Sequence, residues 1–218
     1  MRNLTRREFG TLAISLAALG AAPASAQQGV PRPKFEYLPI DPQPVTTGNS
    51  IEVVEFFWYG CPYCYQLQQP LEAWLKRKPA DVEFRRIPAI FRDSWVPHAR
   101  VYYTLESLGE LGRLHQLVFR SMHLDKDPLN TANVTADWAA RNGVDPTRWL
   151  TAYNSPEVER KVQEARNHTK AYAITGTPSL IVDGRYLTSS AMSENIPGVV
   201  GILEGLIVIA RDRRTTAK

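Results

Sequence analysis

The sequence has few of the side chains that build metal sites or disulfide networks. Its 218 residues include only two cysteines, Cys61 and Cys64, and four histidines. Two cysteines cannot form a framework of structural disulfides, and by themselves they cannot supply the four ligands of a structural zinc site. The histidines lie at none of the spacings typical of metal ligands, such as His-x-x-x-His, so we expect no bound metal.

A strong excess of charge is also missing. The formal net charge is +4, and residues 1–26, with three Arg and one Glu, account for +2 of it. The rest of the chain has 23 basic and 21 acidic residues, and the basic ones are scattered. We therefore expect no nucleic-acid partner. The hydrophobic share of 44% is sufficient for a sizeable core in one domain, with or without an insertion.

The apolar runs are shorter than the roughly 20 residues that cross a bilayer. Residues 1–26 instead have the three zones of a secretory signal peptide: a basic start, an apolar stretch over residues 12–19 and small residues ending at Ala26. We expect export and cleavage near Ala26. Arg6 and Arg7 fit a twin-arginine signal, and a general secretory signal that happens to contain two arginines is the alternative.

Strand and helix patterns divide the remaining chain into three parts. Residues 51–57 predict a buried strand, residues 65–78 a helix with Pro62 in its first turn, and residues 82–87 a second, parallel strand. The end of the chain predicts a hairpin turning at Asp183-Gly184, from residues 179–182 to residues 185–187, and a last helix over 196–211. A short edge strand is expected within residues 35–40.

The middle of the chain predicts helices only. Helical patterns cover residues 97–108, 111–121, 133–142, 146–153 and 156–173. Asn133, Asp145 and Ser155 are the expected starts of the last three. A helical insertion into an α/β fold is the simplest explanation of this order.

The pair Cys61-Pro-Tyr-Cys64 lies at the expected start of the first helix. This spacing can bring two sulfur atoms to disulfide distance. The first sulfur would lie near unpaired N–H groups and the positive end of the helix dipole, which stabilise a thiolate. A thiolate there attacks disulfides, and the second thiol resolves the mixed disulfide. Half of a metal site and an inert structural disulfide are the alternatives.

Two segments together resemble the DsbA family of periplasmic dithiol oxidases. They are residues 55–65, Glu-Phe-Phe-Trp-Tyr-Gly-Cys-Pro-Tyr-Cys-Tyr, and residues 175–179, Thr-Gly-Thr-Pro-Ser, which is similar to that family's cis-proline loop. The order of elements matches over about residues 35–212. The resemblance implies a thioredoxin fold formed by residues 27–93 and 174–218, with residues 94–173 as an inserted helical domain.

The resemblance also implies roles for single residues. Cys61 would be the exposed nucleophile and Cys64 its buried partner. Pro178 would follow a cis peptide bond, although an X–Pro bond is ordinarily trans. Thr177 would face the disulfide and pair with the substrate chain, which Pro62 and Tyr63 would also contact.

Glu55 is a further candidate for the catalytic site, since the family has an acidic residue six positions before the first cysteine. A buried carboxylate there would have a raised pKa and could transfer the proton of Cys64. The alternative is an edge carboxylate with ordinary solvation. Tyr63 departs from the family's commonest form, which has a histidine there, and a tyrosine cannot supply the cation that helps to stabilise a thiolate.

These features predict a monomeric periplasmic oxidase without a cofactor. It would donate its Cys61–Cys64 disulfide to unfolded exported proteins, and a membrane reoxidase of the DsbB type would restore the disulfide. A reductase or isomerase of the same fold is one alternative. A thioredoxin-like module that binds clients without catalysis is another.

Overall fold

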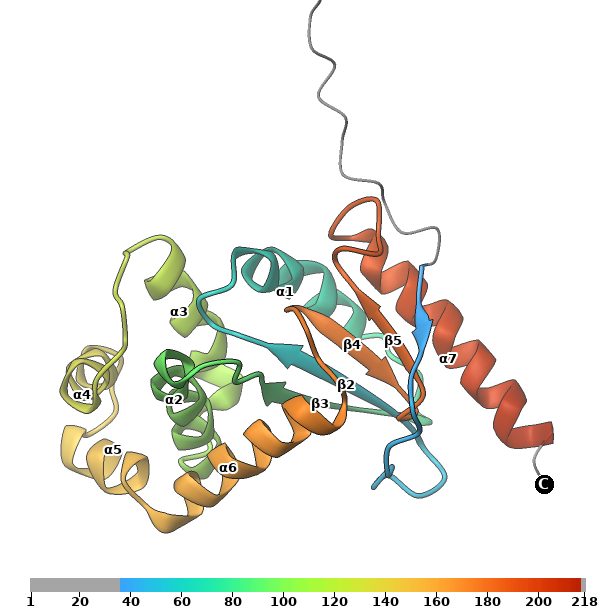
Figure 1. Ribbon diagram of the computed structural model, residues 1–218. Helices are drawn as coiled ribbons and strands as arrows, with labels where there is room; N and C mark the ends of the chain where they lie inside the picture. The colour runs from blue at the N-terminus through green and yellow to red at the C-terminus, as the bar shows by residue number, and fades with distance from the viewer. Residues whose placement is uncertain (1–35, 217–218) are drawn as a thin grey trace, which may run out of the picture. The chain divides into compact units, whose positions relative to one another are not determined.

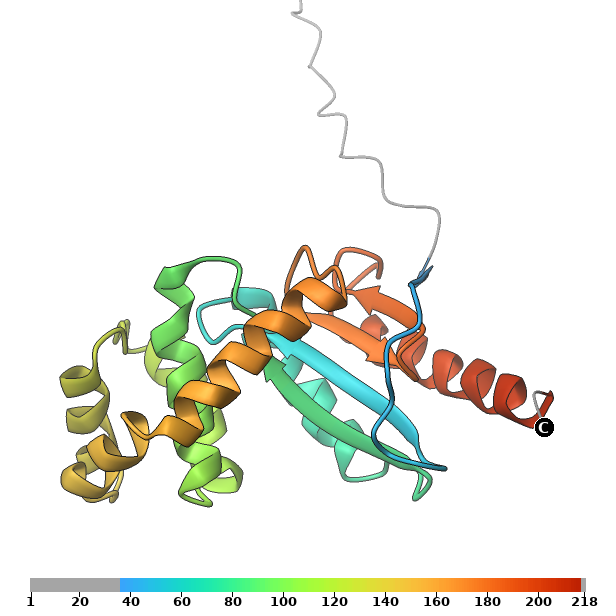
Figure 2. The same cartoon turned by 60° about the horizontal axis from the view of Figure 1, so that its bottom comes forward.

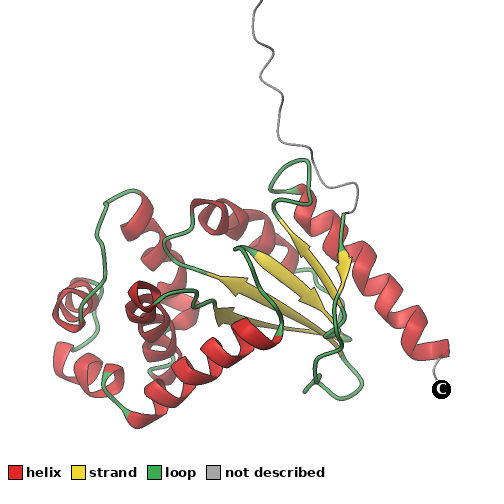
Figure 3. Cartoon of the chain, in the orientation of Figure 1, coloured by secondary structure: helices red, strands yellow, loops and turns green. Residues whose placement is uncertain are grey.

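A five-stranded sheet organises residues 36–216, which are the residues that the computed structural model describes. The strand order is β1-β5-β4-β2-β3, and Figures 1 and 3 show the strands side by side. Strands β2 and β3 are parallel, β4 is antiparallel to β2, and the edge strand β1 pairs with β5. The strands are β1 (Leu38–Pro39), β2 (Ile51–Phe57), β3 (Val82–Pro88), β4 (Ser179–Val182) and β5 (Tyr186–Ser189). The parallel pair, the hairpin and the edge strand are confirmed. The predicted signal peptide lies outside the described residues.

Strand β2 is fully buried because helices cover both faces of the sheet. Val53 packs with apolar residues of α1 (Pro62–Leu75) and α7 (Gly198–Thr216), whereas Phe56 packs into the larger core beneath the helical block. Figure 2 shows α6 crossing the face of the sheet opposite to α1. No helix in residues 36–216 combines the length and apolar character that a membrane crossing requires.

The hairpin between β4 and β5 follows the turn chemistry of its sequence. Asp183 and Gly184 have φ values of 55° and 62°, the left-handed conformation that an Asp-Gly turn favours. A Cβ atom on Gly184 would lie 2.4 Å from the carbonyl oxygen of Gln43, so only glycine fits. The return strand begins at Tyr186, one residue later than predicted, because the N–H of Arg185 closes the turn on the carbonyl of Val182.

Five α-helices lie between β3 and β4 and confirm an α/β fold with an inserted helical domain. They are α2 (Val96–Ser107), α3 (Leu111–His123), α4 (Ala132–Arg141), α5 (Pro146–Tyr153) and α6 (Pro156–Ala171), preceded by a 3-10 turn at Asp93–Trp95. Asp145 and Ser155 cap α5 and α6 as predicted. The predicted start at Asn133 is wrong: Thr131 caps α4, because its extended backbone lets its hydroxyl accept the N–H of Val134.

Candidate active site

The two cysteines occupy the first turn of α1. Cys61 is the N-cap residue, with an extended backbone, and Pro62 occupies the first helical position, where a missing N–H costs nothing. Both thiols are free. Cys64 is fully buried and Cys61 retains 6% of its exposed area, so the expectation of an exposed nucleophile is wrong in degree. Pro62 and Tyr63, between the two cysteines, are both exposed, and Tyr63 is 54% exposed.

The pKa values of the two thiols are shifted in opposite directions. A hydrogen bond from the Cys64 thiol is the main cause that lowers the pKa of Cys61 to about 6, assisted by the side chain of Thr177 and the N–H groups of Tyr63 and Cys64. Burial raises the pKa of Cys64 well above its ordinary value, and its hydrogen bond to Cys61 raises it further. At neutral pH the pair is therefore a Cys61 thiolate beside a Cys64 thiol, the arrangement that attacks and then resolves a disulfide.

The loop before β4 comes directly against Cys61. The Thr177–Pro178 peptide bond is cis, and the Sγ atom of Cys61 lies 3.2 Å from the carbonyl oxygen of Thr177. The strand register explains this contact. Ser179 pairs with Phe56 in antiparallel β4 and β2, so the residues before β4 lie beside the chain that leaves β2 toward Cys61.

Glu55 lies in β2 with its side chain completely buried, which excludes an edge carboxylate with ordinary solvation. Burial raises its pKa, and the adjacent Arg86 partly opposes that rise. The Arg86 Nε atom lies 2.8 Å from the Glu55 carboxylate, since the two residues are register partners in parallel β2 and β3. The negative charge of Glu55 is one of the causes that raise the pKa of Cys64.

Comparisons with known proteins agree with this geometry. Residues 88–199 match the family model of the DSBA-like thioredoxin domain. The thiol:disulfide interchange protein DsbA of Burkholderia cepacia is 36% identical over 211 residues, covering 96% of this chain and 99% of that protein. DsbA of Pseudomonas aeruginosa strain PAO1 is 40% identical over 152 residues, 69% of this chain and 72% of that protein.

The chain belongs to the DsbA family.

A crystal structure of Pseudomonas aeruginosa DsbA has a TM-score of 0.78 and 34% identity, covering 84% of this chain and 95% of that one. The fold is therefore the thioredoxin-like fold of the DsbA proteins, and the chain is a thiol:disulfide oxidoreductase.

Sequence reasoning missed a set of polar side chains that surrounds Glu55 in this DsbA-family chain. Successive hydrogen bonds join five residues, which we call the polar ring: Glu55, Gln68, Gln116, Glu72 and Arg86. Gln68 is buried and follows Cys64 by one helical turn. Its position beside Leu67, on the buried face of α1, is the signal in the sequence that could have identified it.

A second missed feature is the aromatic wall beside Cys61. The Trp58 indole stacks on Trp95 with ring centroids 4.0 Å apart, and its Nε1 donates to Nδ1 of His98. His98 is therefore neutral, with its Nε2 donating to the carbonyl of Pro128, and burial lowers its pKa. A Cβ atom on Gly60 would lie 2.3 Å from the Trp58 ring, so this position before Cys61 requires glycine.

Proposed function

We propose that this chain is a periplasmic dithiol oxidase that passes the Cys61–Cys64 disulfide to exported proteins. The lowered pKa of Cys61 and the raised pKa of Cys64 support this direction of transfer. Reduction of the disulfide produces a thiolate at Cys61 that the folded protein stabilises, and this stabilisation favours the reduced form. A disulfide whose reduced form is favoured in this way is a good oxidant.

The proposed reaction has two exchange steps. A client thiolate attacks the Sγ atom of Cys61, the bond to Cys64 breaks, and the Cys64 sulfur takes up a proton that Glu55 supplies. A second client thiolate then attacks the client sulfur of the mixed disulfide and expels Cys61 as a thiolate. The lowered pKa of Cys61 accelerates this last step, because a thiolate of lower pKa is the better leaving group.

The client chain is proposed to bind beside the cis-proline loop. A pocket of 520 Å³ lies against Thr177 and Pro178, with one side formed by β1 and the other by the segment after β5. We assign to Thr177 the backbone contact with the client. Pro62 and Tyr63, which are both exposed, contact the client from the side of α1. Pro178 supplies no N–H of its own, which leaves neighbouring backbone groups for the client.

The proposal includes export, partners and domain limits. Residues 1–26 are the signal peptide that directs the chain to the periplasm, where it acts as a monomer. Residues 27–93 and 174–218 form the thioredoxin-like domain and residues 94–173 the helical insertion. The clients are unfolded exported proteins with free thiols. A DsbB-type membrane protein accepts the electrons and restores the disulfide.

Oxidative refolding of a reduced, disulfide-containing client tests the proposal. The oxidised protein should form client disulfides stoichiometrically, and Cys61→Ser, which can hold no disulfide, should form none. Reduced Cys64→Ser, mixed with the client in its disulfide form, should accumulate a mixed disulfide through Cys61, because no second thiol of the protein resolves it. Reduction of native client disulfides without oxidation of reduced clients would instead identify a reductase. If the wild-type protein oxidised no client and Cys61→Ser still bound clients, the chain would be a binding module.

A further inference from the structure

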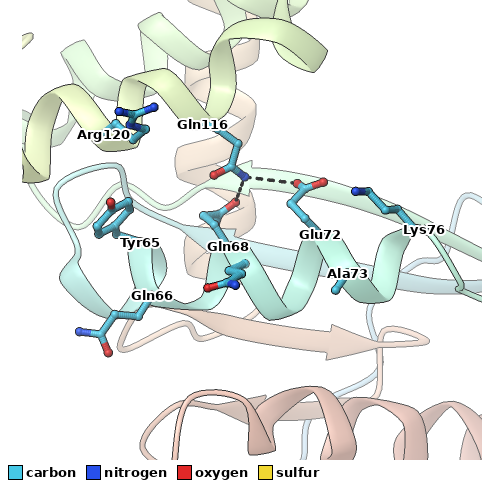
Figure 4. A pocket seen from close by; sticks show the side chains of 9 residues that line it. Tyr65, Gln66, Gln68, Glu72, Ala73, Lys76, Gln116 and Arg120 are labelled. Carbon is cyan, nitrogen blue, oxygen red and sulfur yellow. Dashed lines mark hydrogen bonds between the residues drawn. The ribbon is translucent and has the colours of Figure 1, made fainter.

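Gln116 is the one member of the polar ring that the helical block contributes. Figure 4 shows it reaching from α3 toward α1, where it bonds to Gln68 and Glu72. Its Nε2 lies 3.1 Å from Oε1 of Gln68 and 3.5 Å from Oε1 of Glu72. The contacts lie at a pocket of 720 Å³ between the two helices, so solvent reaches the outer side of the ring while Glu55 stays buried.

The amide of Gln68 has only one orientation that satisfies its neighbours. Its Nε2 donates to the carbonyl oxygen of Cys64 at 3.1 Å and approaches the Glu55 carboxylate at 3.4 Å. Both partners can only accept a hydrogen bond while Glu55 is ionised. The amide oxygen therefore points away from Glu55 and accepts the N–H of Gln116.

We infer that Gln116 is a positioning residue for disulfide exchange, which holds the Gln68 amide with its N–H toward Glu55 and thereby favours the ionised carboxylate that accepts the proton of Cys64. The inference rests on the proposed role of Glu55 as the proton partner of Cys64. It assigns to the helical insertion a direct effect on the dithiol chemistry of the thioredoxin-like part.

The preference for one protonation state follows from hydrogen-bond geometry. A neutral Glu55 needs an acceptor for its new O–H, and Gln68 could become that acceptor only by turning its amide over. The turned amide would lose its bond from Gln116 and place its oxygen against the carbonyl of Cys64. Gln116 therefore stabilises the carboxylate relative to the carboxylic acid. Among the other titratable groups, Arg86 of β3 bonds to Glu55. Glu72 and Cys64 of α1, Tyr59 after β2 and Tyr102 of α2 interact with it electrostatically, whereas β4 places Leu180 beside it.

The proton balance identifies the step that Gln116 affects. When the reduced protein has formed a mixed disulfide between Cys61 and glutathione, the Cys64 thiol attacks the Cys61 sulfur. The new Cys61–Cys64 bond forms, glutathione leaves as a thiolate, and the proton of Cys64 passes to the Glu55 carboxylate. The rate of this step therefore follows the fraction of Glu55 that is ionised.

A titration of Glu55 in the complete mature protein tests the inference directly. The Glu55 carboxyl resonance, assigned by its loss in Glu55→Gln, would be followed by NMR in the reduced protein. Gln116→Met should move the titration midpoint to higher pH, because the Gln68 amide loses its anchor. The matched control is Gln69→Met. Gln69 lies on α1 and lines the same pocket but is not a member of the polar ring, so this variant should leave the midpoint unchanged. An unchanged midpoint in Gln116→Met, or an equal shift in both variants, overturns the inference.

Exchange kinetics separate this inference from the proposed function. The acidic limb of the rate of glutathione release should move to higher pH in Gln116→Met by the same amount as the NMR midpoint. Adding Gln116→Met to Glu55→Gln should change this rate no further, because the two residues act through one carboxylate. A moved NMR midpoint with an unchanged rate would refute the role of Glu55 in proton transfer and, with it, the role of Gln116 in exchange, and only the effect of Gln116 on the Glu55 carboxylate would stand. An additional loss of rate in the double variant would overturn the inference itself.

Discussion

The Sγ atom of Cys61 lies 3.2 Å from the carbonyl oxygen of Thr177, a residue 116 positions away in the sequence. The side chain of Thr177 is also among the groups that lower the pKa of Cys61. Thr177 thus has two effects at the site: its backbone is proposed to contact the client, and its side chain lowers the pKa of the nucleophile.

Thr177→Val should raise the pKa of Cys61 above its value of about 6. Valine keeps the shape of threonine but has no hydroxyl to donate to the thiolate. The rise should be partial, since the larger contribution of the Cys64 thiol remains. The thiolate's ultraviolet absorbance, followed against pH in the reduced protein, measures the change. Thr175→Val, an exposed position of the same loop, is the control and should titrate like the wild type.

Brief alkylation of the reduced protein should modify Cys61 and leave Cys64 untouched. The rate should rise with pH around a midpoint of about 6, because the thiolate is the reactive form. Cys64 is fully buried with a raised pKa, so it is protected twice. Mass mapping of the modified peptides checks the assignment. Preferential labelling of Cys64 would mean that the two roles are reversed.

The reduced protein should be more stable than the oxidised protein at pH 7, and the difference should grow as the pH rises. The folded-state pKa of Cys61 is about 6, below that of an unfolded thiol. The resulting stabilisation is complete above the unfolded pKa and is lost as the pH falls through about 6. Between pH 5 and pH 7 the gain should be about 1 kcal/mol after solvent screening. The disulfide closes too small a loop to compensate much.

Paired urea melts of the two redox forms measure this difference, and titrations common to both forms cancel. Cys61→Ala has no thiolate at this position. Under reducing conditions its free energy of unfolding should therefore change with pH in the same way as that of the oxidised wild-type protein. A difference that stays constant from pH 5 to pH 8, or an oxidised form that is clearly the more stable, would remove the thermodynamic basis for an oxidase.

Tyr63→His should lower the pKa of Cys61 further and make the disulfide a stronger oxidant. The Tyr63 side chain is 54% exposed next to the nucleophile, where a protonated imidazole would be hydrated and still close to the thiolate. The effect should therefore weaken at high salt. Tyr63→Phe retains an aromatic ring without a charge and serves as the control. An equal change in both variants would assign the effect to packing instead of charge.

Local patterns were sufficient to predict the elements and the dithiol. The buried strand of residues 51–57, the helix start at Pro62 and the Asp183-Gly184 turn depend on neighbours in the sequence, so periodicity and turn chemistry identify them. The burial of Glu55 was predictable for the same reason, since apolar residues of one short strand surround it.

The residues that bond to Glu55 could not be predicted from local sequence patterns. Arg86 is 31 positions away and meets Glu55 only through the register of two parallel strands. Gln116 is 48 positions from Gln68, and their contact depends on how α3 packs against α1. The near-complete burial of Cys61 likewise arises from a distant loop, the one that contains Thr177.

Equilibration of the Cys61–Cys64 couple with glutathione mixtures tests the central claim most directly. Acid-quenched samples, alkylated and quantified by mass, give the fraction of dithiol at each ratio of reduced to oxidised glutathione. The stabilised Cys61 thiolate predicts that the dithiol persists in mixtures so oxidising that a thioredoxin-type pair would be fully oxidised. A disulfide that survives in mixtures dominated by reduced glutathione would contradict the oxidase and identify a reductase.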